Sequence, residues 1–141
     1  MKEFYKSAVN KIIIARKKDT KAIVGYAIFS VCDMVDARFG KKPLPSVYLL
    51  RIGVRINSQR QGIGKKLFSY LLDTYPKHGL SLDVSTDNES AIGFYKKMGL
   101  AIRELYLSEP DKVEFALLET PLDKKGIKIP FVVAGSSQNA I

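Results

Sequence analysis

The segment most able to do chemistry runs from Val54 to Leu67, where the sequence reads VRINSQRQGIGKKL. Its first residues continue a strand-like apolar run, its middle is polar and carries two glycines, and its end opens a helical pattern. Glycines at a helix start let the backbone approach a ligand closely, and the free N–H groups there attract anions. The segment therefore predicts a phosphate-binding turn between a strand and a helix.

Two other phosphate-binding loops do not fit these glycines. A Walker loop needs Gly-Lys followed by Ser or Thr, whereas Lys66 follows Lys65 here, and Gln59 occupies the position of the loop's earlier glycine. The dinucleotide fingerprint needs Gly or Ala three residues after Gly64, where this chain has Leu67. Neither loop explains the segment.

A second segment with chemical potential covers residues 88–100, NESAIGFYKKMGL. Asn88 or Ser90 can cap a helix after a short apolar run, and Gly99 is a natural left-handed helix stop. Tyr95 lies on the apolar side of this expected helix. Its phenol suits a core aromatic as well as a proton donor, and the residues alone leave both roles open.

Together the two segments resemble the GNAT superfamily of acetyl-CoA-dependent N-acetyltransferases. The family's cofactor signature has Arg or Gln, two residues, Gly, one residue and then Gly or Ala before a helix, which matches Gln59-Arg-Gln-Gly62-Ile-Gly64. Its later segment has an Asn after a strand and a Tyr seven residues on, which matches Asn88 and Tyr95. The resemblance covers about residues 10–120.

This resemblance implies an enzyme that binds acetyl-CoA (coenzyme A) and lets a primary amine attack the acetyl group directly. The pantetheine arm would lie along the strand that contains Ile52 and Val54, with Asn88 beside the cofactor. Tyr95 would protonate the departing thiolate, and the N–H of Val54 would face the oxyanion. The pyrophosphate would bind the loop formed by Gln59, Arg60, Gln61, Gly62, Ile63, Gly64 and Lys65.

Two more residues are candidates for the group that takes the proton of the amine. Tyr48 lies on the strand before the glycine loop, and Asp83 lies five residues before Asn88. By position both resemble residues used by protein amino-terminal acetyltransferases, although that subfamily has His where this chain has Asp83. Tyr48 is also a good strand former, so a purely structural role for it stays open.

The composition excludes other kinds of site. One cysteine and one histidine provide neither an internal disulfide nor a cysteine or histidine cluster for a metal. No window approaches the ~18 consecutive apolar residues of a membrane span, and the first residues lack a signal-peptide pattern. We therefore expect a cytoplasmic protein without a metal site or a membrane contact.

The elements that would position these residues alternate between strand and helix patterns. Residues 11–17 and 22–31 predict an antiparallel hairpin, and residues 47–55 predict a third strand in which Gly53 marks a bulge or a close approach. We expect a GNAT-like mixed α/β sheet of order β-β-β-α-β-α-β-β, antiparallel and then parallel around two crossover helices. The later helices and strands are predicted at residues 63–75, 80–85, 88–99, 100–107 and 112–119.

We expect a single GNAT acetyltransferase domain over residues 1–120 and a C-terminal extension over residues 121–141 that forms an edge strand or a mobile tail. The family normally opens with a strand and one or two helices, whereas about ten residues precede the first hairpin here. A helix at residues 4–9 would be their remnant. The sheet edge left by the absent strand favours a homodimer.

Several acceptors stay open. The motifs around Tyr48 and Asn88 suggest a protein amino terminus or lysine, and a small amine is nearly as good a choice. Residues 1–72 carry 15 Lys and Arg against 4 Asp and Glu, which suits a solvated surface, a polyanionic cofactor or nucleic acid. Toxin-like acetylation of aminoacyl-tRNA is therefore an alternative. A catalytically silent acyl-CoA-binding module is the alternative from another class.

Overall fold

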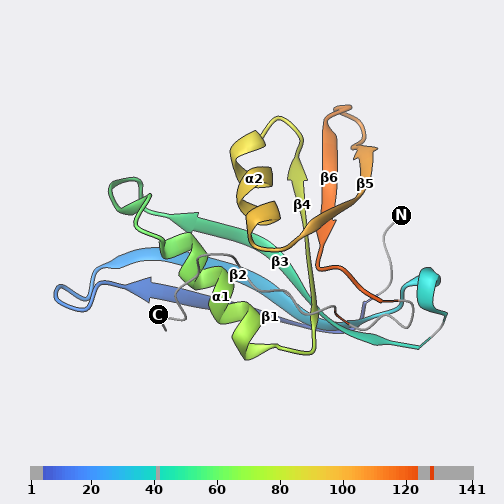
Figure 1. Cartoon of the computed structure of the whole chain (residues 1–141), viewed down its shortest axis with the longest axis horizontal. Helices are drawn as coiled ribbons and strands as arrows, with labels where there is room; N and C mark the ends of the chain where they lie inside the picture. The colour runs from blue at the N-terminus through green and yellow to red at the C-terminus, as the bar shows by residue number, and fades with distance from the viewer. Residues whose placement is uncertain (1–4, 41, 124–127, 129–141) are drawn as a thin grey trace.

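The computed structural model describes residues 5–40, 42–123 and 128, with side chains from Asn10 onward. Within these residues one six-stranded sheet has the order β1-β2-β3-β4-β6-β5 (Figure 1). The chain follows the predicted order of strands and helices. The elements are β1 (Tyr5–Arg16), β2 (Ile23–Met34), β3 (Leu44–Val54), α1 (Ile63–Thr74), β4 (Gly79–Ser85), α2 (Glu89–Lys97), β5 (Ala101–Leu107) and β6 (Glu114–Glu119), with short 3₁₀ turns η1 (Ala37–Phe39) and η2 (Ile56–Ser58).

The pairing of the strands changes from antiparallel to parallel at the middle of the sheet. β1, β2 and β3 pair antiparallel over almost their whole lengths. β3 and β4 pair parallel only where residues 46–48 meet residues 79–81, and the two strands then diverge (Figure 1). On the far side of β4, β6 lies antiparallel between β4 and β5. The divergence leaves a gap between the carboxyl-terminal halves of β3 and β4.

The two helices form where the sequence predicts them. The apolar stripe of α1 buries Leu67, Phe68 and Leu71. The side chain of Asn88 caps α2 by accepting a hydrogen bond from the Ala91 N–H at 3.1 Å. After α2, Gly99 has a φ of 102°, the left-handed conformation that ends a helix without strain in glycine.

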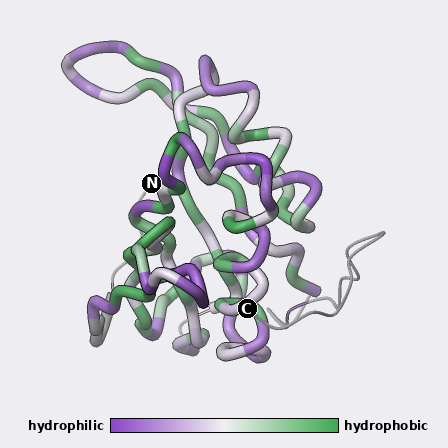
Figure 2. Tube along the Cα trace, turned by 90° about the vertical axis from the view of Figure 1, so that its left-hand side faces the viewer, coloured by the Kyte–Doolittle hydropathy of each residue, from purple (hydrophilic) through white to green (hydrophobic). Residues whose placement is uncertain are grey.

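Both helices pack on the same face of the sheet. The Phe68 ring of α1 lies 6.1 Å from Phe94 and 6.0 Å from Tyr95, both on α2. Figure 2 shows hydrophobic and hydrophilic stretches alternating along the chain. The main buried cluster contains Ala27, Phe29, Val47, Leu49, Phe68, Leu71, Leu80, Leu82, Tyr95, Met98, Leu100, Ala116 and Leu118.

Neighbouring side chains along β4 point to opposite faces, because side chains alternate along a strand. Leu80 and Leu82 are buried in the core on the helix side. Ser81 and Asp83 therefore point to the face opposite α1 and α2, which we call the open face. Both are only partly buried.

The amino-terminal region differs from the prediction. The expected helix at residues 4–9 is wrong for its described part, because residues 5–9 belong to β1. The hairpin is longer than predicted: β2 runs on to Met34, which pairs with Tyr5. Residues 5–9 gain backbone hydrogen-bond partners by pairing with β2, and this pairing outweighs their local helix preference.

β3 also corrects the sequence analysis in detail. It begins at Leu44 instead of residue 47, because Leu44 and Pro45 already pair with β2. Pro45 is tolerated in the strand because pairing with β4 begins only at Ser46. The register shift with β2 falls near Leu50, not at Gly53. Gly53 instead permits a close approach: a Cβ there would lie 2.6 Å from Cε1 of Tyr26.

In the described part of the chain no helix is long and apolar enough to cross a membrane. Of the predicted extension, Leu122 forms an isolated antiparallel bridge with Lys128. Residues 124–127 and 129–141 lie outside the described residues, so the predicted edge strand or mobile tail remains a prediction.

Candidate functional site

A cavity of about 620 Å³ lies between the end of β3, the loop before α1, and α2. Ten of the eleven residues predicted to bind the cofactor line it, whereas Gln61 is exposed outside it. The structure therefore brings two segments that are distant in sequence to one hollow. The lining comprises the predicted Ile52, Val54, Gln59, Arg60, Gly62, Ile63, Gly64, Lys65, Asn88 and Tyr95, together with Gly53, Ser90, Ala91 and Phe94, which sequence reasoning missed.

The loop before α1 is held in a shape that opens the helix start to the cavity. The Gln59 side chain donates from Nε2 to the Val54 carbonyl at 3.1 Å, which ties the loop to β3. Arg60 and Gly62 adopt φ values of 65° and 77°. No side chain caps α1 at Gly62, so the first N–H groups of the helix remain available to a ligand.

Space beside the glycines suits a ligand. In the described part of the chain, and apart from Gly62 and its two chain neighbours, no heavy atom lies within 4 Å of a Cβ built on Gly62. A Cβ on Gly64 would lie 3.7 Å from the Phe94 ring, an ordinary contact. Gly64 therefore tolerates a small side chain, and a larger one would occupy the cavity. At Gly62 there is space, but the φ of 77° would strain any side chain.

Tyr95 belongs to both the core and the cavity. Its ring lies 5.4 Å from Phe94 and 6.0 Å from Phe68. Burial raises the pKa of its phenol above the usual value. The hydroxyl therefore stays protonated near neutral pH, which suits a proton donor. The position of Tyr95 is therefore compatible with both roles that the sequence left open, a core aromatic and a proton donor.

Tyr48 and Asp83, the two candidates for the proton acceptor, are in direct contact. The Tyr48 hydroxyl donates a hydrogen bond to Oδ2 of Asp83. Tyr106, which no sequence pattern singled out, donates to Oδ1 of the same carboxylate at 2.8 Å. Burial raises the pKa of Tyr106 to about 12, with further increases from the hydrogen bond to Asp83 and from the charges of Asp83 and Glu104. We call Tyr48, Asp83 and Tyr106 the Tyr-Asp-Tyr cluster.

The Tyr-Asp-Tyr cluster and the cavity lie at one gap in the sheet. Pairing of β3 with β4 ends at Tyr48 and Ser81, and Asp83 follows two residues later on the open face. The cavity includes the part of β3 beyond this point, from Ile52 to Val54, and residues of α1 and α2 on the helix side. A reaction in the gap could thus use Asp83 from one face and Tyr95 from the other.

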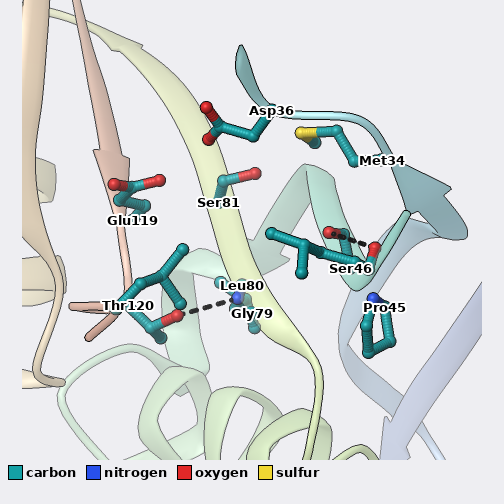
Figure 3. A pocket seen from close by; sticks show the side chains of 11 residues that line it. Met34, Asp36, Pro45, Ser46, Gly79, Leu80, Ser81, Glu119 and Thr120 are labelled. Atoms are coloured by element: carbon teal, nitrogen blue, oxygen red, sulfur yellow. Dashed lines mark hydrogen bonds between the residues drawn. The ribbon is translucent and has the colours of Figure 1, made fainter. Parts of the chain in front are cut away.

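A smaller hollow of about 30 Å³ lies near the start of β4 (Figure 3). Its volume suits at most one or two water molecules. Asp36, Ser81 and Glu119 lie on one side of it, and Thr120 accepts a hydrogen bond from the Leu80 N–H at 3.1 Å (Figure 3). The hollow is too small for an acyl carrier.

The charged side chains beside this hollow form a structural clamp. Arg38 contacts Asp36 at 2.7 Å and Glu119 at 2.9 Å. Arg103 lies 3.6 Å from Asp36, which is 4% exposed. Burial alone would raise the pKa of Asp36, but the hydrogen bonds from Arg38 and the charges of Arg103 and Arg38 lower it below its usual value. The clamp fastens the β2–β3 connection to β5 and β6.

Comparison with protein families and curated proteins points to acetyltransferases. The family described as acetyltransferase (GNAT) matches residues 2–100. N-alpha-acetyltransferase 50 of Danio rerio is 37% identical over 82 residues, which cover 55% of this chain and 47% of that protein. Ribosomal protein bS18-alanine N-acetyltransferase of Escherichia coli strain K12 is 33% identical over 81 residues, which cover 53% and 55%. The chain spans about half the length of these curated relatives.

Solved structures share the fold. Arabidopsis thaliana NAA60 in complex with a bisubstrate analogue has a TM-score of 0.62 at 19% identity, over 79% of this chain and 74% of that one. Arabidopsis thaliana Naa50 in complex with the bisubstrate analogue CoA-Ac-MVNAL has a TM-score of 0.55 at 25% identity, over 72% and 68%. The mixed sheet with two helices predicted from the sequence is therefore confirmed as the fold of this group.

Proposed function

Since the chain belongs to the acetyltransferase (GNAT) family, we propose that it transfers the acetyl group of acetyl-CoA to a primary amine. The observation that carries this proposal is the cavity of about 620 Å³, which joins the glycine loop, the diverging end of β3 and Tyr95. The names of the two curated relatives favour a protein amino terminus as the acceptor. A lysine side chain or a small amine is the next candidate.

The residues of the cavity fit a molecule with a pyrophosphate and a long thioester arm. The uncapped start of α1 offers N–H groups and the positive end of the helix dipole to the pyrophosphate. Arg60 and Lys65 line the same cavity and add positive charge. Ile52 and Val54 provide an apolar wall along β3 for the arm, and Asn88 borders it from α2.

The proposed chemistry uses one proton acceptor and one proton donor. Acetyl-CoA supplies an activated carbonyl carbon, to which the amine nitrogen bonds as the carbon–sulfur bond breaks. Asp83 receives the proton that the amine loses, because Tyr48 already donates its own hydroxyl hydrogen to Asp83. Tyr95 gives its proton to the leaving sulfur. No covalent bond between the protein and the acetyl group is needed.

Three more expectations stay proposals. A homodimer is supported by the position of β1 at the edge of the sheet, where a second strand can pair with it. The single domain over residues 1–120 with a C-terminal extension, and the cytoplasmic location, rest on the sequence alone.

The first experiment is thermal unfolding of the full chain with acetyl-CoA, with ADP as the control. A ligand that binds only the folded state stabilises it by about 2.7 kcal/mol at 100 times its Kd. We expect acetyl-CoA to raise the unfolding temperature more than ADP does. No shift at saturating acetyl-CoA would contradict the proposed cofactor site.

The second experiment measures thiol release from acetyl-CoA with different amines. The probes are a Met-Val-Asn-Ala-Leu peptide with a free amino terminus, a lysine peptide with a blocked amino terminus, a small polyamine and an aminoacyl-tRNA. We expect the free amino-terminal peptide to give the fastest release. Release with aminoacyl-tRNA alone would select the toxin-like alternative, and binding without release would select the silent acyl-CoA-binding module.

A further inference from the structure

Tyr106 is the one member of the Tyr-Asp-Tyr cluster to which neither sequence nor proposed function gives a role. It lies on β5, and β6 separates β5 from β4. Adjacent strands are about 4.8 Å apart, so strands on either side of β6 are about 10 Å apart. A tyrosine is long enough for its hydroxyl to reach Asp83 across β6, and the bond length is 2.8 Å.

The ring of Tyr106 is fixed along its length. It stacks on Phe115 of β6 with a centroid distance of 5.8 Å and an angle of 18° between the planes. The hydroxyl at its far end is bonded to Asp83. Because its pKa is raised to about 12, the hydroxyl is a hydrogen-bond donor near neutral pH and not a base. Tyr106 can therefore act on a reaction only through Asp83 or by direct contact.

The two tyrosines set the orientation of the carboxylate. Tyr48 donates to one oxygen of Asp83 and Tyr106 to the other. An ionised carboxylate has about four acceptor sites, so one site on each oxygen is still open to a further donor. The plane of a carboxylate is otherwise weakly restrained, because its last torsion is broad. Two donors from two strands remove this freedom.

Resting on the proposed function, we infer that Tyr106 is a positioning residue that holds the Asp83 carboxylate towards an acceptor amine arriving from the open face. The amine and the acetyl carrier would then enter the gap between β3 and β4 from opposite faces. Asp83 follows the last pair of these strands on the open face, and the cavity lies on the helix side. The nitrogen of the acceptor amine would bind beside Asp83, which takes the proton that this nitrogen loses as the amide bond forms.

The test is a double-mutant cycle on the full chain with Tyr106→Phe and Asp83→Asn. Tyr106→Phe keeps the ring on Phe115 and removes only the hydroxyl. We expect it to lower kcat/KM for the amine about tenfold, the loss of one hydrogen bond to a charged group, and to leave the KM for acetyl-CoA unchanged. Tyr70→Phe, on an exposed position of α1, is the matched control and should be neutral.

The double variant decides between positioning and packing. If Tyr106 acts through Asp83, adding Tyr106→Phe to Asp83→Asn slows the enzyme no further. The inference is overturned if the decreases in kcat/KM of the two single variants multiply in the double variant. It is also overturned if kcat/KM of Tyr106→Phe stays within about twofold of the wild type while Asp83→Asn is slow. An inactive wild-type chain that binds acetyl-CoA would instead refute the proposed function, and the inference with it.

Discussion

The prediction that bears most directly on the proposed chemistry is that Tyr95→Phe slows acetyl transfer without weakening the fold. The substitution removes only the phenolic oxygen. The ring would still pack against Phe94 at 5.4 Å and Phe68 at 6.0 Å, so the free energy of unfolding should change by less than about 1 kcal/mol. The cavity keeps its shape, so affinity for acetyl-CoA should stay within about twofold.

The expected loss of rate follows from the role of the hydroxyl. A general acid contributes about 10²–10⁴-fold in many enzymes, and a thiolate leaves more readily than an alkoxide or an amine. We therefore expect kcat to fall by about 10 to 1,000-fold, or about 1.4 to 4 kcal/mol of barrier. Because burial raises the pKa of Tyr95, the wild type keeps its proton through the neutral range. The ratio of the two rates should thus be constant across that range.

The assay is thiol release from acetyl-CoA with the peptide acceptor, at saturating concentrations of both and at several pH values. Tyr70→Phe serves as the control, since Tyr70 is 45% exposed on α1. An unchanged kcat in Tyr95→Phe would remove this residue from the role of acid and leave it as a core aromatic. A variant that also loses its thermal shift with acetyl-CoA would show that the hydroxyl supports binding instead.

Two further predictions concern the glycine loop and the charged clamp. Gly64→Val should abolish the thermal shift with acetyl-CoA, whereas Gly64→Ala should keep it, since a Cβ there makes only an ordinary contact at 3.7 Å with Phe94; full binding by the valine variant would reject the cofactor loop. Asp36→Asn should destabilise the fold by about 1–3 kcal/mol near neutral pH in urea unfolding. The folded-state pKa of Asp36 is lowered, so its stabilisation is present above its unfolded pKa and is lost as the pH falls through the folded value. The variant and the wild type should therefore converge once the pH is below that lowered folded-state pKa. A constant difference at all pH values would refute this account of the clamp.

The parts of the structure that the sequence predicted are those set by local physics. The helix over Ile63–Thr74 follows from a 3.6-residue apolar period, and the start of α2 follows from a capping side chain at Asn88. The glycine loop was found because its chemistry is local. The prediction that the glycine loop and Tyr95 lie in one site came from the family resemblance, because no local sequence pattern indicates that two helices line the same cavity.

The parts that the sequence left open depend on strand order. Tyr106 could be placed on a strand, but only the insertion of β6 between β4 and β5 puts its hydroxyl within reach of Asp83. Likewise, residues 5–9 have no strong strand pattern, and they extend because β2 continues to Met34 as a partner. Long-range pairing overrides weak local preference in both cases.

The short parallel contact between β3 and β4 has a mechanical consequence. It joins β1, β2 and β3 to β4, β5 and β6 through three residue pairs. Pairing within the first half is much longer, and pairing within the second half comprises five pairs between β4 and β6 and six between β5 and β6. Backbone pairing at this joint is therefore the sparsest in the described sheet. A molecule in the cavity would contact β3 and α1 on one half and α2 on the other, and would connect the two halves. If the chain binds acetyl-CoA as proposed, the cofactor would stiffen this joint while it is bound, and release of coenzyme A would loosen it again.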